Sequence, residues 1–274
     1  MKNFILLFLA LSTFAVSAQR KPKIKGNKTI VDVNEDLPFF NAIELRDDLE
    51  VLLKKTAIPG YSVSADDNLI DVLKFEVVDS TLIIRSFYKI TAKKQLEITV
   101  NYNELNSISL ENGKLVSGDM INAEVLNISA YGSSKLELNA RASIMNITME
   151  GNSTGDFNLQ TDSLDLKLRD KTDLNLYGII SKGTIEMYDN THTVAEGTAD
   201  TLNIKLFGSS NLKAENLEAG VVHAVVEETT KARIHAYKTI ELSSSGSAKT
   251  YLWGNAKLTI NEFLNTSELY KREE

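Results

Sequence analysis

The side chains able to do chemistry are few in this chain and lie far apart. There are only three histidines, His192, His223 and His235, and no cysteine. The sequence contains no phosphate-binding loop and no His-Glu-x-x-His motif, so the usual marks of nucleotide-binding proteins and zinc peptidases are missing. The histidines fall at different positions of the repeat described below. We therefore interpret them as surface residues and predict neither a metal site nor a cofactor.

Two carboxylates make the best case for catalysis. Glu137 and Asp156 occupy the same outward position of adjacent repeats, about 4.8 Å apart at the backbone. Glycoside hydrolases use two carboxylates separated by about 5 to 10 Å. A carbohydrate-active enzyme, either a polysaccharide lyase or a glycoside hydrolase, is therefore the alternative function. No Arg, Lys or His joins the pair at matching positions of its own repeats, so we predict no catalytic residues.

Calcium is a weaker alternative. The acidic turn pairs Asp170 with Asp173 and Glu227 with Glu228 could supply oxygen ligands. However, Ca²⁺ takes six or more oxygens, and the Gly-Gly-x-Gly-x-Asp repeat of calcium-binding β-rolls is absent.

A repeat of 18 to 20 residues organises the chain from Leu105 to about Glu262. Its turn-like tetrapeptides begin at Glu111, Tyr131, Glu150, Arg169, Tyr188, Phe207, Glu227 and Ser245. Apolar and polar residues alternate before each turn and again after it, which indicates strands with one buried face. Two short strands and two tight connections use up the repeat, so no crossover helix fits. We predict an all-β fold, a right-handed parallel β-solenoid of about eight coils with an N-terminal β cap.

The second position of each turn suits a positive φ angle. Glycine occupies it in several repeats, as in Gly132 and Gly208. Asn112, Asp170 and Asp189 tolerate the same conformation, and Glu228 is the exception.

Five aromatic residues are the candidate ligand-binding residues. Tyr131, Tyr188 and Phe207 occupy the first turn position, whereas Tyr177 and Trp253 lie eight residues after it. Outward rings on a rigid ladder commonly anchor sugars or proteins. The alternative is that the rings stack on one another along the ladder and stabilise it.

The segments outside the repeat divide the chain further. Residues 1–18 have a basic start, an apolar run from Phe4 to Val16 and small residues before Gln19, which predicts a signal peptide too short to span a membrane. We expect a flexible basic leader over 19–28 and an N-terminal β segment over 29–104 that caps the solenoid. Solenoid repeats follow over 105–264, and a C-terminal tail over 265–274.

The net charge of −7 limits the partners. Nucleic acid and anionic lipid both favour clustered Lys and Arg, so we expect neither as a partner. The signal peptide predicts export to the periplasm, the cell surface or the medium, and without cysteine the chain has no disulfides and no lipid-carrying cysteine.

The order and spacing of several motifs resemble the head GIN domain, a domain found in secreted proteins of Bacteroidetes-type bacteria. They are the turns Tyr131-Gly-Ser-Ser, Phe207-Gly-Ser-Ser and Ser245-Gly-Ser-Ala, the earlier Phe40-Asn-Ala-Ile43, and the closing Tyr251-Leu-Trp-Gly-Asn-Ala-Lys257. The resemblance covers roughly residues 38–270. It implies a β-solenoid and a role in adhesion, and it supplies no functional residues.

From the residues and this resemblance together, we predict an exported, non-enzymatic recognition or adhesion protein that presents a rigid surface to a glycan or an envelope protein. A component of an envelope stress or transport assembly, bound through its edges, is a further alternative beside the carbohydrate-active enzyme.

Overall fold

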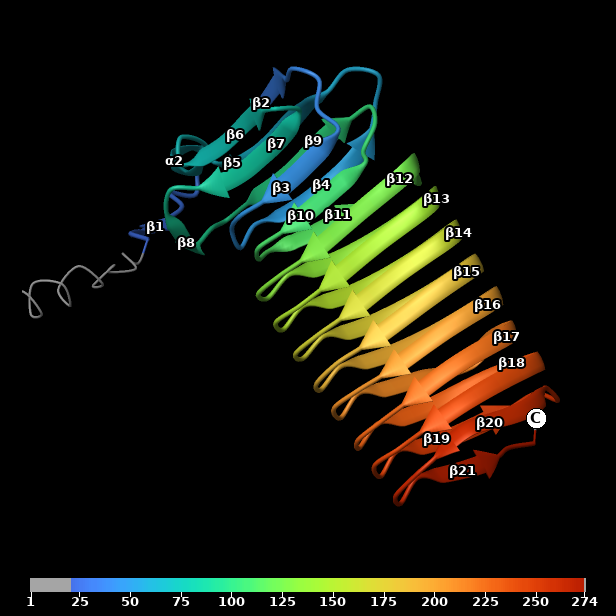
Figure 1. Cartoon of the computed structure of the whole chain (residues 1–274). Coiled ribbons are helices and arrows are strands. Elements are labelled where there is room, and N and C mark those ends of the chain that lie inside the picture. Colours follow the sequence, from blue (N-terminus) through green and yellow to red (C-terminus); the bar gives the residue numbers. More distant parts are fainter. Residues whose placement is uncertain (1–20, 274) are drawn as a thin grey trace, which may run out of the picture.

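The coils of the protein stack in parallel into a rod. The computed structural model describes residues 21–273, so the predicted signal peptide, together with Gln19 and Arg20, lies outside the described residues. The rod is a β-solenoid of about nine turns with a β cap at its N-terminal end (Figure 1). This confirms the predicted all-β solenoid.

Each full coil consists of two strand segments on opposite faces of the rod. β14 (Thr154–Leu168) runs along one face to Thr161, bends at Asp162, and returns along the other face to Leu168. A tight turn then leads into the next coil. We call the strands that run into a turn the pre-turn sheet and those that leave it the post-turn sheet.

The strands of the solenoid pair in parallel with their neighbours in the next coil. They are β10 (Ser107–Leu110), β11 (Lys114–Ser117), β12 (Ile121–Ala130), β13 (Lys135–Met149), β14, β15 (Asp173–Met187), β16 (His192–Leu206), β17 (Asn211–Val226), β18 (Lys231–Ser244), β19 (Lys249–Trp253), β20 (Lys257–Phe263) and β21 (Glu268–Lys271).

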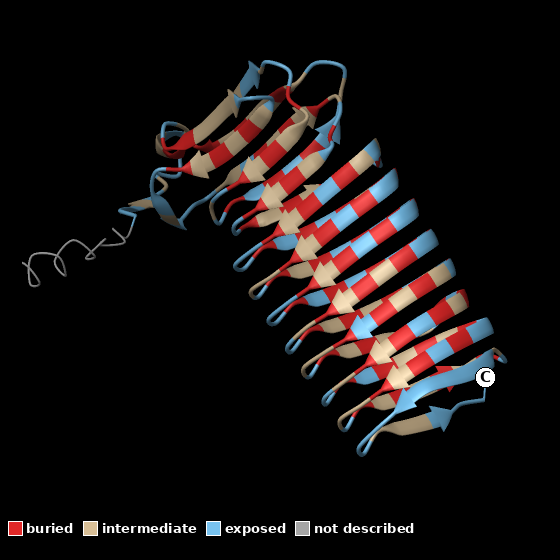
Figure 2. Cartoon of the chain, viewed as in Figure 1, coloured by how far each residue is buried: buried red, intermediate tan, exposed pale blue. Residues whose placement is uncertain are grey.

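The apolar columns predicted from the sequence fill the space between the two sheets. Buried residues alternate with more exposed ones along most strands of the solenoid (Figure 2). The buried columns are Ile108, Ile128, Ile147, Leu166, Ile185, Ile204 and Leu242, and Leu110, Met149, Leu168, Met187, Leu206 and Val226. Because these columns continue from coil to coil, each coil is stabilised chiefly by burial against its two neighbours.

The turns adopt the backbone conformation expected at their second position. The φ angle is positive in Gly132, Asp170 and Asp189, at 66°, 61° and 59°. The prediction for Asn112 is wrong, because in that turn the next residue, Gly113, has the positive φ of 84°. The turn between β10 and β11 is one residue shorter than those after it, and the Asn112 side chain accepts a hydrogen bond from the Ser133 amide at 3.1 Å.

Glu228 adopts the same turn conformation with a φ of 62°, although it has a Cβ atom. A left-handed conformation costs a residue with a side chain about 1 to 2 kcal/mol. We expect Glu228→Gly to raise the free energy of unfolding by about 1 kcal/mol in urea denaturation. The neighbouring substitution Glu227→Gly removes the same charge without relieving this strain, so it should not stabilise the protein. Equal effects of the two substitutions would contradict the explanation.

The cap continues both sheets and then changes strand direction. β3 (Ala42–Leu45) and β4 (Glu50–Lys55) pair in parallel with β10 and β11, so the parallel ladder begins inside the segment predicted as a cap. β7 (Thr81–Ser86) and β9 (Leu96–Tyr102) add one more parallel strand to each sheet. Beyond them, β6 (Leu73–Val78) lies antiparallel on β7, and β5 (Gly60–Asp66) and β2 (Ile30–Asp36) lie antiparallel beyond β9. A short helix, α2 (Asp67–Ile70), joins β5 to β6.

A separate two-stranded ribbon lies beside the cap. In the leader that we predicted as flexible, β1 (Lys23–Lys25) pairs in parallel with β8 (Lys89–Ala92). Ile24 and Ile90 are paired in this ribbon and pack against the core, which provides the burial that orders the leader.

The C-terminal end of the rod differs from the capped end. β21 continues the post-turn sheet within the predicted tail, and among residues 21–273 no strand lies beyond β20 and β21. All residues of β20 are exposed, including Ile260 at 48%, whereas its register partner Leu242 in the preceding coil is fully buried. The inward residues of the last coil therefore remain in contact with solvent.

Candidate functional site

The two carboxylates considered for catalysis are register partners on the post-turn sheet. Glu137 on β13 lies directly beside Asp156 on β14. They line a shallow hollow of about 270 Å³ with Ser117, Asn139 and Asn158. The predicted adjacency of the pair is therefore correct.

One carboxylate of this pair, Glu137, forms an ion pair with a lysine of the preceding coil, Lys114. The Lys114 ammonium lies 2.8 Å from Glu137 Oε1 and 3.4 Å from Glu50 Oε1. The hydrogen bond to Glu137 raises the pKa of Lys114 above its usual value. The arrangement is that of a surface ion pair.

The three histidines lie in different coils and have different neighbours. His223 Nδ1 is 3.3 Å from Glu241, and His235 Nδ1 is 3.2 Å from the Glu215 carbonyl oxygen. In the part of the chain that the structure describes, no three His, Asp or Glu side chains are arranged to hold a metal ion. Of the acidic turn residues, Asp170 accepts a hydrogen bond from the Gly151 amide at 2.8 Å, which links adjacent turns.

On the edge of the rod, three successive turns each contribute one side chain to a stacked column, which consists of a guanidinium group and two aromatic rings. The rings of Tyr188 and Phe207 stack with their centroids 5.2 Å apart and an interplanar angle of 16°. The Arg169 guanidinium lies 5.1 Å from the centroid of Tyr188. We call Arg169, Tyr188 and Phe207 the aromatic edge. Stacking along the ladder, the alternative considered from the sequence, is therefore found for Tyr188 and Phe207.

Glu186 holds the Tyr188 ring of the aromatic edge in place through a hydrogen bond. Its carboxylate accepts hydrogen bonds from the Tyr188 hydroxyl at 3.1 Å and from the Lys205 ammonium at 2.9 Å, with Lys167 at 3.4 Å. The hydrogen bond from Lys205 lowers the pKa of Glu186, and burial raises the pKa of Tyr188. Because Glu186 is held between two lysines, the Tyr188 ring is oriented before any partner arrives.

Sequence reasoning did not assign Glu186 to the site. The signal was present in the outward column Lys167, Glu186 and Lys205, where the charge alternates from coil to coil. Such a column predicts an ion-pair ladder, and Tyr188 lies two residues from its central member.

The other three predicted residues are not brought together. Tyr131 is 39% exposed and lies on the same edge, three coils before Tyr188. Tyr177 is 50% exposed on the post-turn sheet. Trp253 lies on the same sheet four coils further along, beside His235, and the register shifts between β16 and β18 take it out of the column of Tyr177. Only Tyr188 and Phe207 therefore form a common surface.

A second aromatic stack lies at the C-terminal end and was not predicted. The rings of Tyr251 and Tyr270 are 5.0 Å apart, and the Arg272 guanidinium lies 5.0 Å and 5.6 Å from their centroids. Tyr270 falls in the predicted tail, so its register with Tyr251 was not considered.

Solved structures share this fold at low sequence identity. A putative adhesin from Parabacteroides merdae is 15% identical with a TM-score of 0.67, covering 92% of this chain and 99% of its own. A putative adhesin from Parabacteroides distasonis has the same identity and TM-score over 91% and 100% of the two chains. A putative lipid binding protein from Parabacteroides distasonis is 16% identical with a TM-score of 0.65, over 91% and 99%.

Within residues 21–273 no helix combines the length and the hydropathy that a membrane crossing requires.

Comparisons with curated proteins and with family models give different results. No curated protein matches the chain. One family model, described as putative auto-transporter adhesin, head GIN domain, matches residues 39–256. The chain therefore belongs to the head GIN domain family of putative auto-transporter adhesins.

Proposed function

We propose that this protein is an exported, non-enzymatic recognition protein that binds a glycan or an envelope protein through the aromatic edge. The observation that carries the proposal is the fixed column of Arg169, Tyr188 and Phe207 on the rim of a rigid rod. The description of its family as adhesins supports the same role.

The composition of the aromatic edge suits recognition. Two partly exposed rings lie among the charged side chains of Arg169, Glu186 and Lys205, which offer donors and acceptors around an apolar centre. Binding hot spots are enriched in Tyr and Arg, and a polar rim surrounds them. Since the ladder already orders these side chains, binding costs little further conformational entropy.

Catalysis has less support. The pair Glu137 and Asp156 is the best acidic pair, and Glu137 is engaged in an ion pair with Lys114. We therefore propose binding without turnover. If a bound glycan were cleaved, and Glu137→Gln or Asp156→Asn stopped the cleavage, the carbohydrate-active enzyme would replace this proposal.

A double substitution tests the aromatic edge. We expect Tyr188→Ala with Phe207→Ala to weaken binding to a glycan array and to an immobilised envelope fraction about ten-fold or more, since two hot-spot rings are removed. Tyr177→Ala is the matched control. This exposed ring lies on the post-turn sheet, away from the turns that carry the aromatic edge, so its removal should leave binding unchanged. Circular dichroism would verify folding of all variants. Undiminished binding by the double variant, or an equal loss in the control, would refute the role of the aromatic edge.

A further inference from the structure

A hollow of about 720 Å³ lies between the β1–β8 ribbon and the turn edge of the first coils. Its lining comes from segments far apart in the sequence, including Lys23 of the leader, Asp48 of the turn after β3, Tyr88 and Lys89 before and in β8, and Asn112 and Ser133 of later turns. Ligand sites in proteins commonly measure about 300 to 1,000 Å³. The hollow therefore has the size of a site for one or two sugar units, and it is separate from the aromatic edge.

Two lysines in the wall of the hollow lie side by side, and neither has an ion-pair partner among the described residues. Lys23 on β1 and Lys89 on β8 are direct register partners, so their backbones are about 4.8 Å apart. Like charges placed directly opposite each other destabilise a strand pair. Neither lysine forms an ion pair with an acidic side chain of residues 21–273, although the whole chain has a net charge of −7. An anion from outside would balance these two charges.

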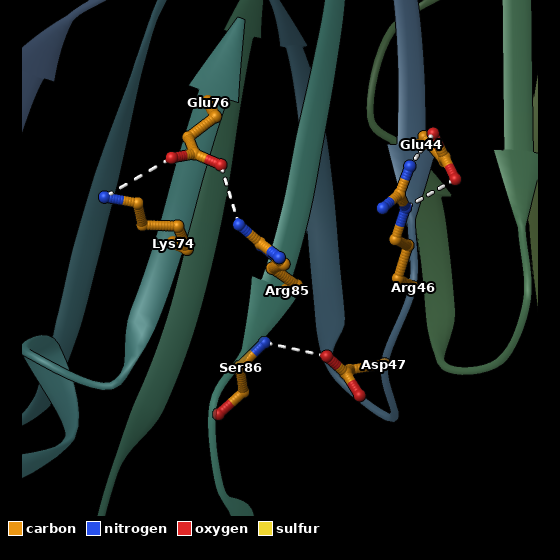
Figure 3. A network of polar contacts seen from close by, with 7 residues as sticks. All are labelled: Glu44, Arg46, Asp47, Lys74, Glu76, Arg85 and Ser86. Carbon is orange, nitrogen blue, oxygen red and sulfur yellow. Dashed lines mark hydrogen bonds and ion pairs between the residues drawn. The ribbon is translucent and has the colours of Figure 1, made fainter. Parts of the chain in front are cut away.

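The wall beside the lysine pair is already fixed and neutralised. Asp47 accepts a hydrogen bond from the Ser86 amide at 2.8 Å, as Figure 3 shows, and also from the Lys21 ammonium. Lys21 in turn donates to the Ser86 carbonyl oxygen at 2.8 Å. Asp47 therefore has its own partners, and Lys23 and Lys89 remain available to a ligand.

The same part of the cap is braced by further ion pairs. Glu76 joins Lys74 at 3.4 Å to Arg85 at 2.9 Å, across the antiparallel pair β6 and β7 that leads to Ser86 (Figure 3). Arg46, next to Asp47, donates two hydrogen bonds to Glu44. These contacts hold the strand ends that carry the hollow.

The other lining groups suit a sugar more than a flat or apolar partner. Asp48 is an exposed carboxylate that accepts from hydroxyls, while Asn112 and Ser133 offer an amide and a hydroxyl group. The Tyr88 ring is 38% exposed at the rim and presents the kind of surface on which sugars pack. A flat bilayer surface suits a hollow of this kind less than a sugar ring, which carries hydroxyl groups and can carry one negative group.

We infer that this hollow binds an acidic sugar of a glycan, with its carboxylate or sulfate group between Lys23 and Lys89. The overall negative charge of the chain does not oppose such binding, because the cap concentrates lysines locally. The ribbon carries three further exposed lysines, Lys25 on β1 and Lys93 and Lys94 directly after β8. Binding through exposed ammonium groups should weaken as the salt concentration rises.

Titration with defined glycans tests the inference. Oligogalacturonate supplies carboxylates, a chondroitin sulfate oligosaccharide adds sulfates, and maltohexaose is the neutral comparison. We expect calorimetry at low salt to detect binding of at least one acidic glycan and no binding of maltohexaose. We expect Lys23→Gln with Lys89→Gln to lower the affinity about ten-fold or more. The matched control, Lys171→Gln with Lys182→Gln, removes two exposed lysines from the solenoid and should leave the affinity unchanged.

Several results would overturn the inference. One is that wild-type protein binds neither acidic glycan, and another is that the lysine substitutions leave the affinity unchanged. Binding to vesicles containing phosphatidylglycerol that depends on Lys23 and Lys89, without glycan binding, would assign the surface to a membrane instead. The double lysine variant loses a like-charge repulsion, so its melting temperature should not fall. The Tyr188→Ala, Phe207→Ala variant should bind acidic glycans normally, so this site and the aromatic edge can fail independently.

Discussion

Replacement of Gly197 by alanine should destabilise the solenoid by about 3 kcal/mol or more. Gly197 has a φ of 112°, which residues with a side chain rarely adopt. A Cβ atom there would collide with the carbonyl oxygen of Gly178, its register partner in the preceding coil. Because the obstacle is backbone, it cannot move aside without disrupting the hydrogen bonds between the coils.

Gly183→Ala is the matched control for this prediction. Gly183 lies one coil bend after Gly178 and has no positive φ. An added Cβ atom would lie 3.0 Å from Leu202 Cδ1 and 3.3 Å from Ile180 Cγ2, which are side-chain methyl groups and not backbone atoms. We expect a loss of about 1 kcal/mol or less in urea denaturation followed by circular dichroism. Similar losses for both variants would show that the φ angle and the backbone contact do not decide the effect.

Phe157→Ala should cost about 3 to 5 kcal/mol, because it removes a fully enclosed ring from the middle of the rod. Phe157 is 1% exposed. Gly155, two residues earlier on the same inward face, makes room for it: a Cβ atom there would lie 3.0 Å from Phe157 Cζ and 2.8 Å from Leu174 Cδ1. A large and a small inward residue thus share one layer of the core.

A double-mutant cycle tests this sharing of space. In the wild-type background, Gly155→Ala should cost about 1 to 3 kcal/mol through overpacking. In the Phe157→Leu background the same substitution should cost less, since the ring edge is gone, although the Leu174 contact remains. The coupling should be measurable by equilibrium unfolding. Additive losses would mean that Gly155 and Phe157 do not compete for the same space.

The solenoid could be predicted because its information is local and repeated. Ile147, Leu166 and Ile185 occupy the same inward position in three successive repeats, so each repeat supports the strand assignment of the others. Pairing at one repeat apart also follows from the period, so the adjacency of Glu137 and Asp156 and the Tyr188–Phe207 stack could be predicted.

Features that depend on distant segments were not predictable in the same way. The pairing of Lys23 with Lys89 joins segments outside the repeat, so the repeat period does not predict it. The leader reads as a polar arm, since only Ile24 of β1 contributes apolar burial. Lys114 was overlooked beside Glu137 because it comes from the preceding coil, whose turn is one residue shorter.

The direction of the strands has a mechanical consequence. The backbone hydrogen bonds between coils run along the length of the rod, since the strands lie across it (Figure 1). A pull between the two ends would load those bonds in line and peel the molecule open one layer at a time, beginning where β20 and β21 have a neighbour on one side only. Each layer would release about 19 residues, or roughly 65 Å of extended chain. Under such a pull the rod would therefore lengthen in steps and give way gradually.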